Sequence, residues 1–213
     1  MQRDTRLVNI KGVPMVIYQS PECISDDIVK YNNFWEFELY QKWSLNFPTH
    51  GLMLDLGANI GSHCLQFAKN SPNLQILAFE LHHENFKLLK INTQPFKNIK
   101  CYNIGIGSTT SMITYNDGHE QNAGVVKLDE NGLNDNIVLA LDDLRFDKTI
   151  NFIKIDIEGH ELSAFEGMRK TLLKHKPKIW LEDIHGNAVP YLQDLGYSII
   201  KSEPETFDYL MKF

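Results

Sequence analysis

The feature that most constrains the fold is an alternation of short apolar segments with segments of helical spacing, which begins near residue 51. Continuous apolar strands that alternate with helices are typical of a parallel sheet covered on both faces. The last two strands differ, because the loop around Pro204 that joins them is too short for a parallel crossover. We therefore predict an α/β fold with a doubly wound, mostly parallel sheet that ends in an antiparallel hairpin. The predicted strands are 52–55, 74–79, 100–106, 137–141, 152–157, 178–181, 197–200 and 207–213, with helices at 63–69, 82–93 and 161–174.

The first 50 residues precede this alternation and are predicted to form an extension, either a lid or an extra layer. Residues 5–18 read as a hairpin of two short strands. A helix is expected to begin at Ser25, whose hydroxyl would cap it, and to continue through the aromatic residues 34–45. We therefore divide the chain into an extension, 1–50, and a main domain, 51–213.

Composition excludes several classes of protein. The chain has 213 residues, with 21 basic and 27 acidic side chains and a net charge of −6, so no nucleic-acid partner is expected. No stretch reaches the ~20 apolar residues of a membrane span, and no apolar core of signal-peptide length follows the N-terminus. The three cysteines are widely spaced and include no CxxC pair, which favours reduced thiols in a cytoplasmic protein.

A glycine-rich turn follows the strand at 52–55, at the edge of the sheet where ligands bind in such folds. Gly57 permits a sharp exit from the strand, and Gly61 lets the next helix approach closely. Glu80 ends the following strand, where a carboxylate can accept both hydroxyls of a ribose. Tight packing alone would also explain such glycines, but the combination favours a nucleoside cofactor. Asn59 stands where a nicotinamide fingerprint needs its second glycine, which argues against a pyrophosphate ligand.

These residues resemble a known family. The turn from Asp55 to Gly61 is similar to the S-adenosylmethionine (SAM) motif of class I methyltransferases. More narrowly, residues 141–144 (Leu-Asp-Asp-Leu) and 153–161 (Ile-Lys-Ile-Asp-Ile-Glu-Gly-His-Glu) resemble the signature of FkbM-like methyltransferases. The resemblance covers about residues 34–213 and implies a Rossmann-like sheet of about seven strands and methyl transfer from SAM, usually to oxygen. It also implies a set of cofactor-binding residues: Asp55, Gly57, Asn59 and Gly61 at the methionine and ribose, Glu80 at the ribose, and Asn103 and Ile104 at the adenine.

Three residues are candidates for the chemistry itself. Asp156 ends a buried strand at the ligand edge and would bind the substrate or the cofactor's amino group, although acids are also favoured at a helix start. Glu182 and His185 follow the next strand and match an acid-then-histidine pattern of the FkbM-like family. A histidine can take a proton from a hydroxyl near neutral pH, while a loop histidine bonded to the backbone is an equal alternative.

A divalent metal is an alternative aid to this chemistry. Asp156, Glu158, Glu182 and His185 would have to converge to hold it, and their spacing is not a metal-ligand motif, so no metal site is assigned. For Glu161, a structural role at the start of its helix is preferred. The polar, turn-rich residues 115–136 are predicted to form a mobile substrate loop.

The sequence thus predicts a SAM-dependent O-methyltransferase that acts on a hydroxyl of a sugar, a glycan or a small natural product. The sugar part rests on family analogy alone. The alternative is a non-catalytic module that keeps the methyltransferase fold and binds SAM or a partner. A third interpretation, a nicotinamide oxidoreductase, is disfavoured by Asn59 and by the C-terminal hairpin.

Overall fold

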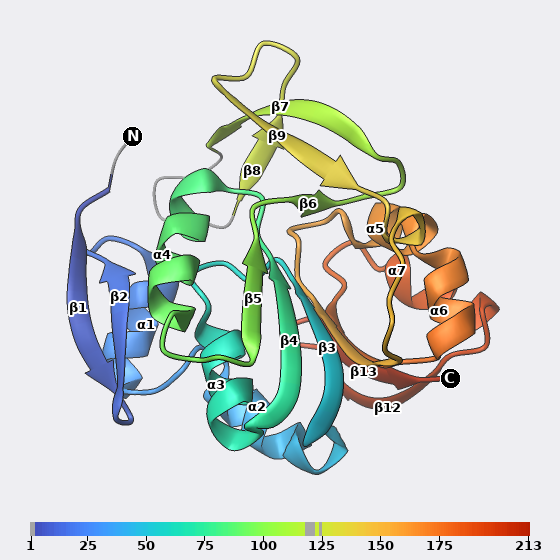
Figure 1. Cartoon of the computed structure of the whole chain (residues 1–213), viewed down its shortest axis with the longest axis horizontal. Coiled ribbons are helices and arrows are strands. Elements are labelled where there is room, and N and C mark those ends of the chain that lie inside the picture. The colour runs from blue at the N-terminus through green and yellow to red at the C-terminus, as the bar shows by residue number, and fades with distance from the viewer. Residues whose placement is uncertain (1–2, 118–121, 124) are drawn as a thin grey trace.

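The computed structural model describes residues 3–117, 122, 123 and 125–213, and a seven-stranded sheet forms its centre (Figure 1). The strand order is β12-β13-β11-β10-β3-β4-β5, in which the last five strands are parallel and β13 runs antiparallel to both β11 and β12. The predicted Rossmann-like sheet with a C-terminal antiparallel hairpin is therefore confirmed. Its strands are β3 (His50–Leu56), β4 (Asn73–Phe79), β5 (Ile99–Tyr102), β10 (Ile150–Ile155), β11 (Lys178–Glu182), β12 (Ser198–Glu203) and β13 (Asp208–Lys212).

Helices cover both faces of this sheet, because successive residues of each buried strand point to opposite sides. Met53 of β3 packs in a core with Phe67 of α3 (Ser62–Asn70) and Leu89 of α4 (His83–Thr93). Its neighbour Leu54 packs in the other core, with side chains of α5 (Glu161–Gly167), α6 (Arg169–His175) and α7 (Ala188–Asp194). The chain winds outward from β3 to β5 on one side and through β10 and β11 on the other, so the topological switch point lies between β3 and β10.

The N-terminal residues form the predicted hairpin, β1 (Thr5–Ile10) and β2 (Val13–Tyr18), which lies beside α4. The prediction of one aromatic helix is wrong. The structure has α1 (Cys23–Tyr31), then an irregular link, then α2 (Phe37–Trp43) and the short 3-10 helix η1 (Ser44–Asn46). The predicted cap is also wrong, because the Glu22 carboxylate accepts a hydrogen bond from the Ser25 amide at 2.8 Å and thus caps α1.

A second, four-stranded sheet of order β6-β9-β7-β8 lies over the carboxyl ends of β4 and β5 (Figure 1). Its strands are β6 (Gly105–Ile106), β7 (Ser111–Asp117), β8 (Val126–Leu128) and β9 (Asn134–Leu139). It corrects three predictions. The strand at 100–106 is split between the two sheets, the strand at 137–141 belongs to the small sheet, and the loop at 115–136 contains β8 and the ends of β7 and β9. Residues 118–121 and 124 of that loop lie outside the described residues.

The helix predicted at 161–174 is broken at Met168 into α5 and α6. Gly167, the last residue of α5, lets the backbone of Gly107 pass close by, since a Cβ there would lie 2.0 Å from the Gly107 carbonyl oxygen. Asp142, within the 3-10 helix η2 (Leu141–Asp143), then accepts hydrogen bonds from the Lys170 and Thr171 amides at the start of α6. Part of the Leu-Asp-Asp-Leu signature is therefore a helix cap.

Helix α7 was not predicted from the sequence, and its first amides donate to the buried Asp183 carboxylate. The three cysteines are free thiols: Cys64 is buried, Cys101 is half-buried and Cys23 is exposed. Over the described residues, none of the helices has both the length and the apolar character needed to cross a membrane.

Candidate functional site

The glycine turn after β3 brings backbone amides to the carboxyl edge of the sheet. Gly57 has φ +81°, and a Cβ there would lie 1.8 Å from the Asp156 carbonyl oxygen, so β3 and β10 can approach only with glycine at this position. Asn59 is also left-handed, with φ 51°, and its side chain accepts a hydrogen bond from the Ile60 amide. Gly61, with φ +94°, is the N-cap of α3.

Glu80 lies directly across this turn, at the end of β4. One carboxylate oxygen accepts a hydrogen bond from the Asn59 amide and the other from the His82 amide, both at 2.7 Å. The side chain is buried, and burial raises the pKa of Glu80 to about 7 in spite of these two bonds. The carboxyl group is thus fixed between two loops, and each oxygen keeps a lone pair for a ligand.

A cavity of about 250 Å³ opens beside Glu80, between the carboxyl edge of the large sheet and the small sheet. Its polar wall contains Gly57, Asn59, Glu80, Asp156 and Glu158. Its other wall is mostly apolar and comes from both sheets: Phe79, Leu81, Ile104, Ile106, Ile113, Leu128 and Val138. An apolar slot with a few converging polar groups is the usual form of a small-molecule site.

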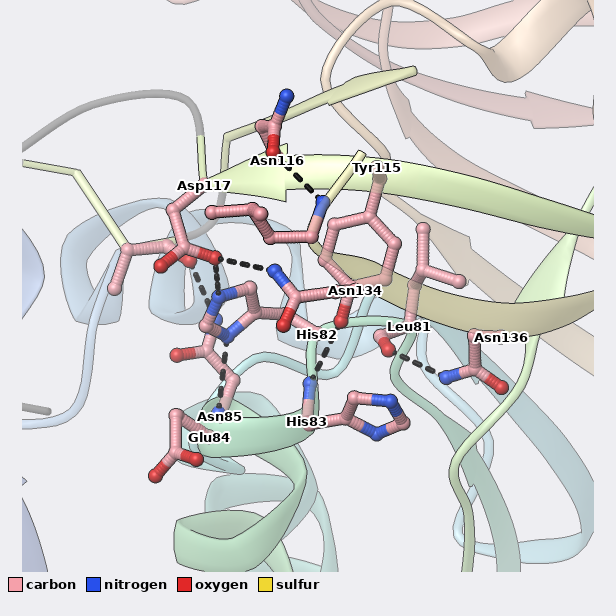
Figure 2. A network of polar contacts seen from close by, with 12 residues as sticks. Leu81, His82, His83, Glu84, Asn85, Tyr115, Asn116, Asp117, Asn134 and Asn136 are labelled. Atoms are coloured by element: carbon pink, nitrogen blue, oxygen red, sulfur yellow. Dashed lines mark hydrogen bonds and ion pairs between the residues drawn. The ribbon is translucent and has the colours of Figure 1, made fainter. Parts of the chain in front are cut away.

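Hydrogen bonds fasten the small sheet to the loop that carries Glu80 (Figure 2). His82 Nε2 lies 2.9 Å from Asp117 Oδ1 of β7, and the His83 amide donates to the Tyr115 hydroxyl at 3.2 Å. The Tyr115 ring is fully buried. The small sheet beside the cavity and the Glu80 carboxylate are therefore positioned by the same short loop.

A charged cluster lies at the end of β10. Lys154 Nζ lies 3.0 Å from Asp156 Oδ2, and the Lys154 side chain is only 3% exposed. Burial alone would raise the pKa of Asp156, but the Lys154 charge and a hydrogen bond from Glu182 hold it below its usual value. Burial and the charge of Asp156 raise the pKa of Glu182 to about 9. Near neutral pH, Glu182 therefore keeps its proton and Asp156 is the ionised partner.

The structure brings five of the predicted site residues to the cavity wall, namely Gly57, Asn59, Glu80, Ile104 and Asp156. The other predicted residues lie behind that wall or beside it, and each has a different role in the structure.

Asp55 is fully buried and accepts a hydrogen bond from the Cys64 thiol at 2.9 Å. Gly61 packs closely against Leu89 of α4. A Cβ on Gly61 would lie only 2.9 Å from the Leu89 side chain, so the contact requires glycine. Asn103 donates to the Glu80 carbonyl oxygen at 2.7 Å, so it braces the loop that carries the Glu80 carboxylate. These three residues support the cavity from outside its wall.

Glu182 reaches the site through its hydrogen bond with Asp156. His185 is exposed and its ring stands over Gly159, where a Cβ would lie 2.4 Å from Nε2. Glu161 accepts hydrogen bonds from the Ile157 and Gly159 amides, so its carboxylate braces the turn before α5. This contact agrees with the structural role preferred for Glu161 from the sequence.

Lys154 is the functional residue that sequence reasoning missed, although its signal was present. It is the one charged residue of the mostly apolar strand β10, and a buried charge needs a partner. In the part of the chain that the structure describes, no three His, Cys, Asp or Glu side chains gather to hold a metal ion. These residues therefore do not form a site for the divalent metal that was considered as an alternative.

Comparison with known protein families decides the assignment. The model of the methyltransferase FkbM domain matches residues 55–199, which run from the glycine turn to the start of the C-terminal hairpin. The chain belongs to the FkbM methyltransferase domain family. The match includes Gly57, Glu80, Lys154, Asp156 and Glu182, whereas the N-terminal hairpin, α1 and α2 precede it.

Solved structures show the same fold. A methyltransferase FkbM from Methylobacillus flagellatus is 22% identical with a TM-score of 0.58, over 78% of this chain and 44% of that chain. A chain of a fibrillarin/Nop5p complex is 12% identical with a TM-score of 0.51, over 99% of this chain and 94% of that chain. This FkbM domain thus spans less than half the length of the Methylobacillus protein. No curated protein matches its sequence significantly.

Proposed function

We propose that this FkbM domain transfers a methyl group from SAM to a hydroxyl group of a sugar, a glycan or a small natural product. The observation that carries the proposal is the position of Glu80. Its buried carboxylate is fixed by the amides of Asn59 and His82 and lines the cavity beside the glycine turn. A carboxylate in that position is suited to accept hydrogen bonds from the two hydroxyls of a ribose.

The remaining walls of the cavity fit the other parts of SAM. Ile104, Ile106 and Leu81 supply apolar surface for an adenine ring. Asp156 and Glu158 bring negative charge to the opposite wall, where an amino group and a sulfonium would be stabilised. When bound, SAM supplies an electrophilic methyl group. The chain supplies position and electrostatics.

The acidic pair Asp156 and Glu182 would set the charge near the reacting groups. Asp156, kept ionised by Lys154, would orient the acceptor or hold the cofactor's amino group. Glu182 would keep Asp156 in place through the shared proton. His185 is exposed, so it would take a proton only from an acceptor that covers the edge near Gly159. Residues 1–50 would form an extra layer beside the main domain.

The test is a transfer assay with SAM labelled in its methyl group, run against a panel of hydroxylated sugars, glycans and small natural products. We expect labelled product with the wild type, none with Asp156→Asn, and full activity with Asp147→Asn, an exposed control. Asp156→Asn should still be folded by circular dichroism. Cofactor binding without transfer to any acceptor would contradict catalysis and favour the non-catalytic module.

A further inference from the structure

Among the residues that the structure describes, four titratable side chains line the cavity: Glu80, Asp156, Glu158 and His160. Three of them are poorly suited to take a proton from an acceptor. Glu80 is held by two backbone amides at the proposed ribose position, and Lys154 keeps Asp156 ionised and therefore weakly basic. His160 is exposed before α5, where water reaches its ring. The remaining group is Glu158.

The backbone presents Glu158 to the cavity. Glu158 is left-handed, with φ 56°, and Gly159 follows with φ +95°. The Glu161 carboxylate fixes this turn, because it accepts hydrogen bonds from the Ile157 and Gly159 amides at 3.0 and 3.1 Å. A glutamate in this region of backbone conformation is strained, and such strain is concentrated at functional sites. Here the strained turn places a carboxylate in the cavity wall.

A side chain from the small-sheet side orients this carboxylate. Asn122 Nδ2 donates a hydrogen bond to Glu158 Oε1 at 3.2 Å. Asn122 lies in the connection between β7 and β8, so the bond joins the turn before α5 to the small sheet. Within the described residues, no hydrogen bond occupies Oε2 of Glu158, which leaves that oxygen to accept a proton.

The charges around Glu158 suit a base. Asp156 and Lys154 interact with it from β10, Glu161 from α5, and Cys23 from α1. Burial and the charge of Asp156 raise the pKa of Glu158 above its usual value. A raised pKa makes a carboxylate a better proton acceptor near neutral pH.

We propose that Glu158 is the base that takes the proton from the acceptor hydroxyl. The inference rests on the proposed methyl transfer. As the acceptor oxygen bonds to the methyl carbon, the carbon–sulfur bond breaks with its electron pair left on sulfur, and the hydroxyl proton passes to Glu158 Oε2. Proton uptake removes a negative charge in the same step in which the sulfur loses its positive charge. The positive sulfur thus keeps Glu158 ionised before transfer, and the neutral sulfur favours its protonated form afterwards.

The test uses the wild-type chain with 13C in its glutamate carboxyl groups and compares the complexes with S-adenosylhomocysteine (SAH) and with SAM by NMR over a range of pH. The two ligands differ by one positive charge, at the sulfur whose methyl would be transferred. We take the pH at which Glu158 is half protonated in the SAH complex. There, the ratio of protonated to ionised Glu158 should be at least about tenfold lower with SAM. Loss of the signal in Glu158→Gln assigns it.

Glu166, exposed on α5, is the matched control, and its ratio should be the same in both complexes. A Glu158 ratio that agrees within about twofold between the SAH and SAM complexes would overturn the inference while leaving cofactor binding intact. If neither ligand binds the folded chain, the proposed function itself fails, and this inference fails with it.

Turnover separates a base from a residue that only balances the sulfur's charge. With an acceptor that the transfer assay identifies, wild-type kcat should fall as pH drops through the titration of Glu158 seen in the SAM complex. Glu158→Gln should lower kcat at least about 100-fold and lose that pH dependence, and Glu158→Asp should restore part of the rate. Full kcat in a folded Glu158→Gln would overturn the inference, and so would a loss confined to His160→Gln.

Discussion

The buried Lys154 and the half-buried Asp156 form an ion pair at the end of β10, with 3.0 Å between Nζ and Oδ2. Although burial alone would lower the pKa of Lys154, the charges of Asp156 and Asp55 hold it above its usual value. The same lysine therefore neutralises acids on two neighbouring strands. Asp156 lines the cavity, and Asp55 lies under the glycine turn.

We expect Lys154→Met to lower the free energy of unfolding by about 3 kcal/mol, because it leaves the buried Asp55 and the half-buried Asp156 without their cation. Lys42→Met is the control, since Lys42 pairs with Glu203 at the surface and should change stability by less than ~1 kcal/mol. Urea unfolding followed by circular dichroism measures both. Equal effects of the two substitutions would refute the role given to Lys154.

Gly57 and Gly12 offer a matched pair for the glycine turn. Both are left-handed, with φ +81° and +84°, but a Cβ on Gly12 would meet nothing within 4 Å, whereas one on Gly57 would collide with the Asp156 carbonyl oxygen. Gly12→Ala should therefore lose about 1–2 kcal/mol from backbone strain alone. Gly57→Ala should lose clearly more and should no longer bind SAH. Thermal unfolding and a binding titration would show the difference, and similar losses would contradict the close approach of β3 and β10.

Stability should fall as pH rises from about 5 to 9. Burial raises the pKa of Glu80 and Asp208 to about 7, and burial with the Asp156 charge raises that of Glu182 to about 9. A folded state with raised carboxyl pKa values binds more protons than the unfolded chain, so its advantage is lost as pH passes through those values.

Urea unfolding at pH 5, 7 and 9 checks this dependence. Glu182→Gln cannot ionise at this position, so it should flatten the decline between pH 7 and 9 and leave the decline below pH 7 in place. A wild type whose stability is constant or rises over the same interval would contradict the protonation assigned to Glu182 and Glu80.

Much of the main sheet could be predicted because its strands are buried on both faces and therefore read as continuous apolar runs. The glycine turn and Glu80 were found for a related reason: a parallel strand places the residues that follow it at the ligand edge. The terminal hairpin followed from the length of one loop. Each of these signals is local in the sequence.

The small sheet was missed because its pairing is not local. Gly105–Ile106 is too short to show a strand pattern, and it pairs with β9 some 30 residues later. The break of the long helix at Met168 lies beside the close approach of Gly107 to Gly167, a contact that the helix sequence does not reveal. The hydrogen bond from Asn122 to Glu158 joins two segments with no pattern in common.

The most direct test of the account is calorimetric titration of the folded chain with SAH, beside Glu80→Ala and the control Glu84→Ala, whose side chain is 40% exposed and pairs with Lys87. We predict saturable binding by the wild type and by Glu84→Ala. In Glu80→Ala the Asn59 and His82 amides lose their acceptor, and the ribose loses its carboxylate partner. Affinity should fall at least about tenfold in a folded Glu80→Ala. A folded wild type that does not bind SAH would contradict the claim that this cavity holds the methyl donor.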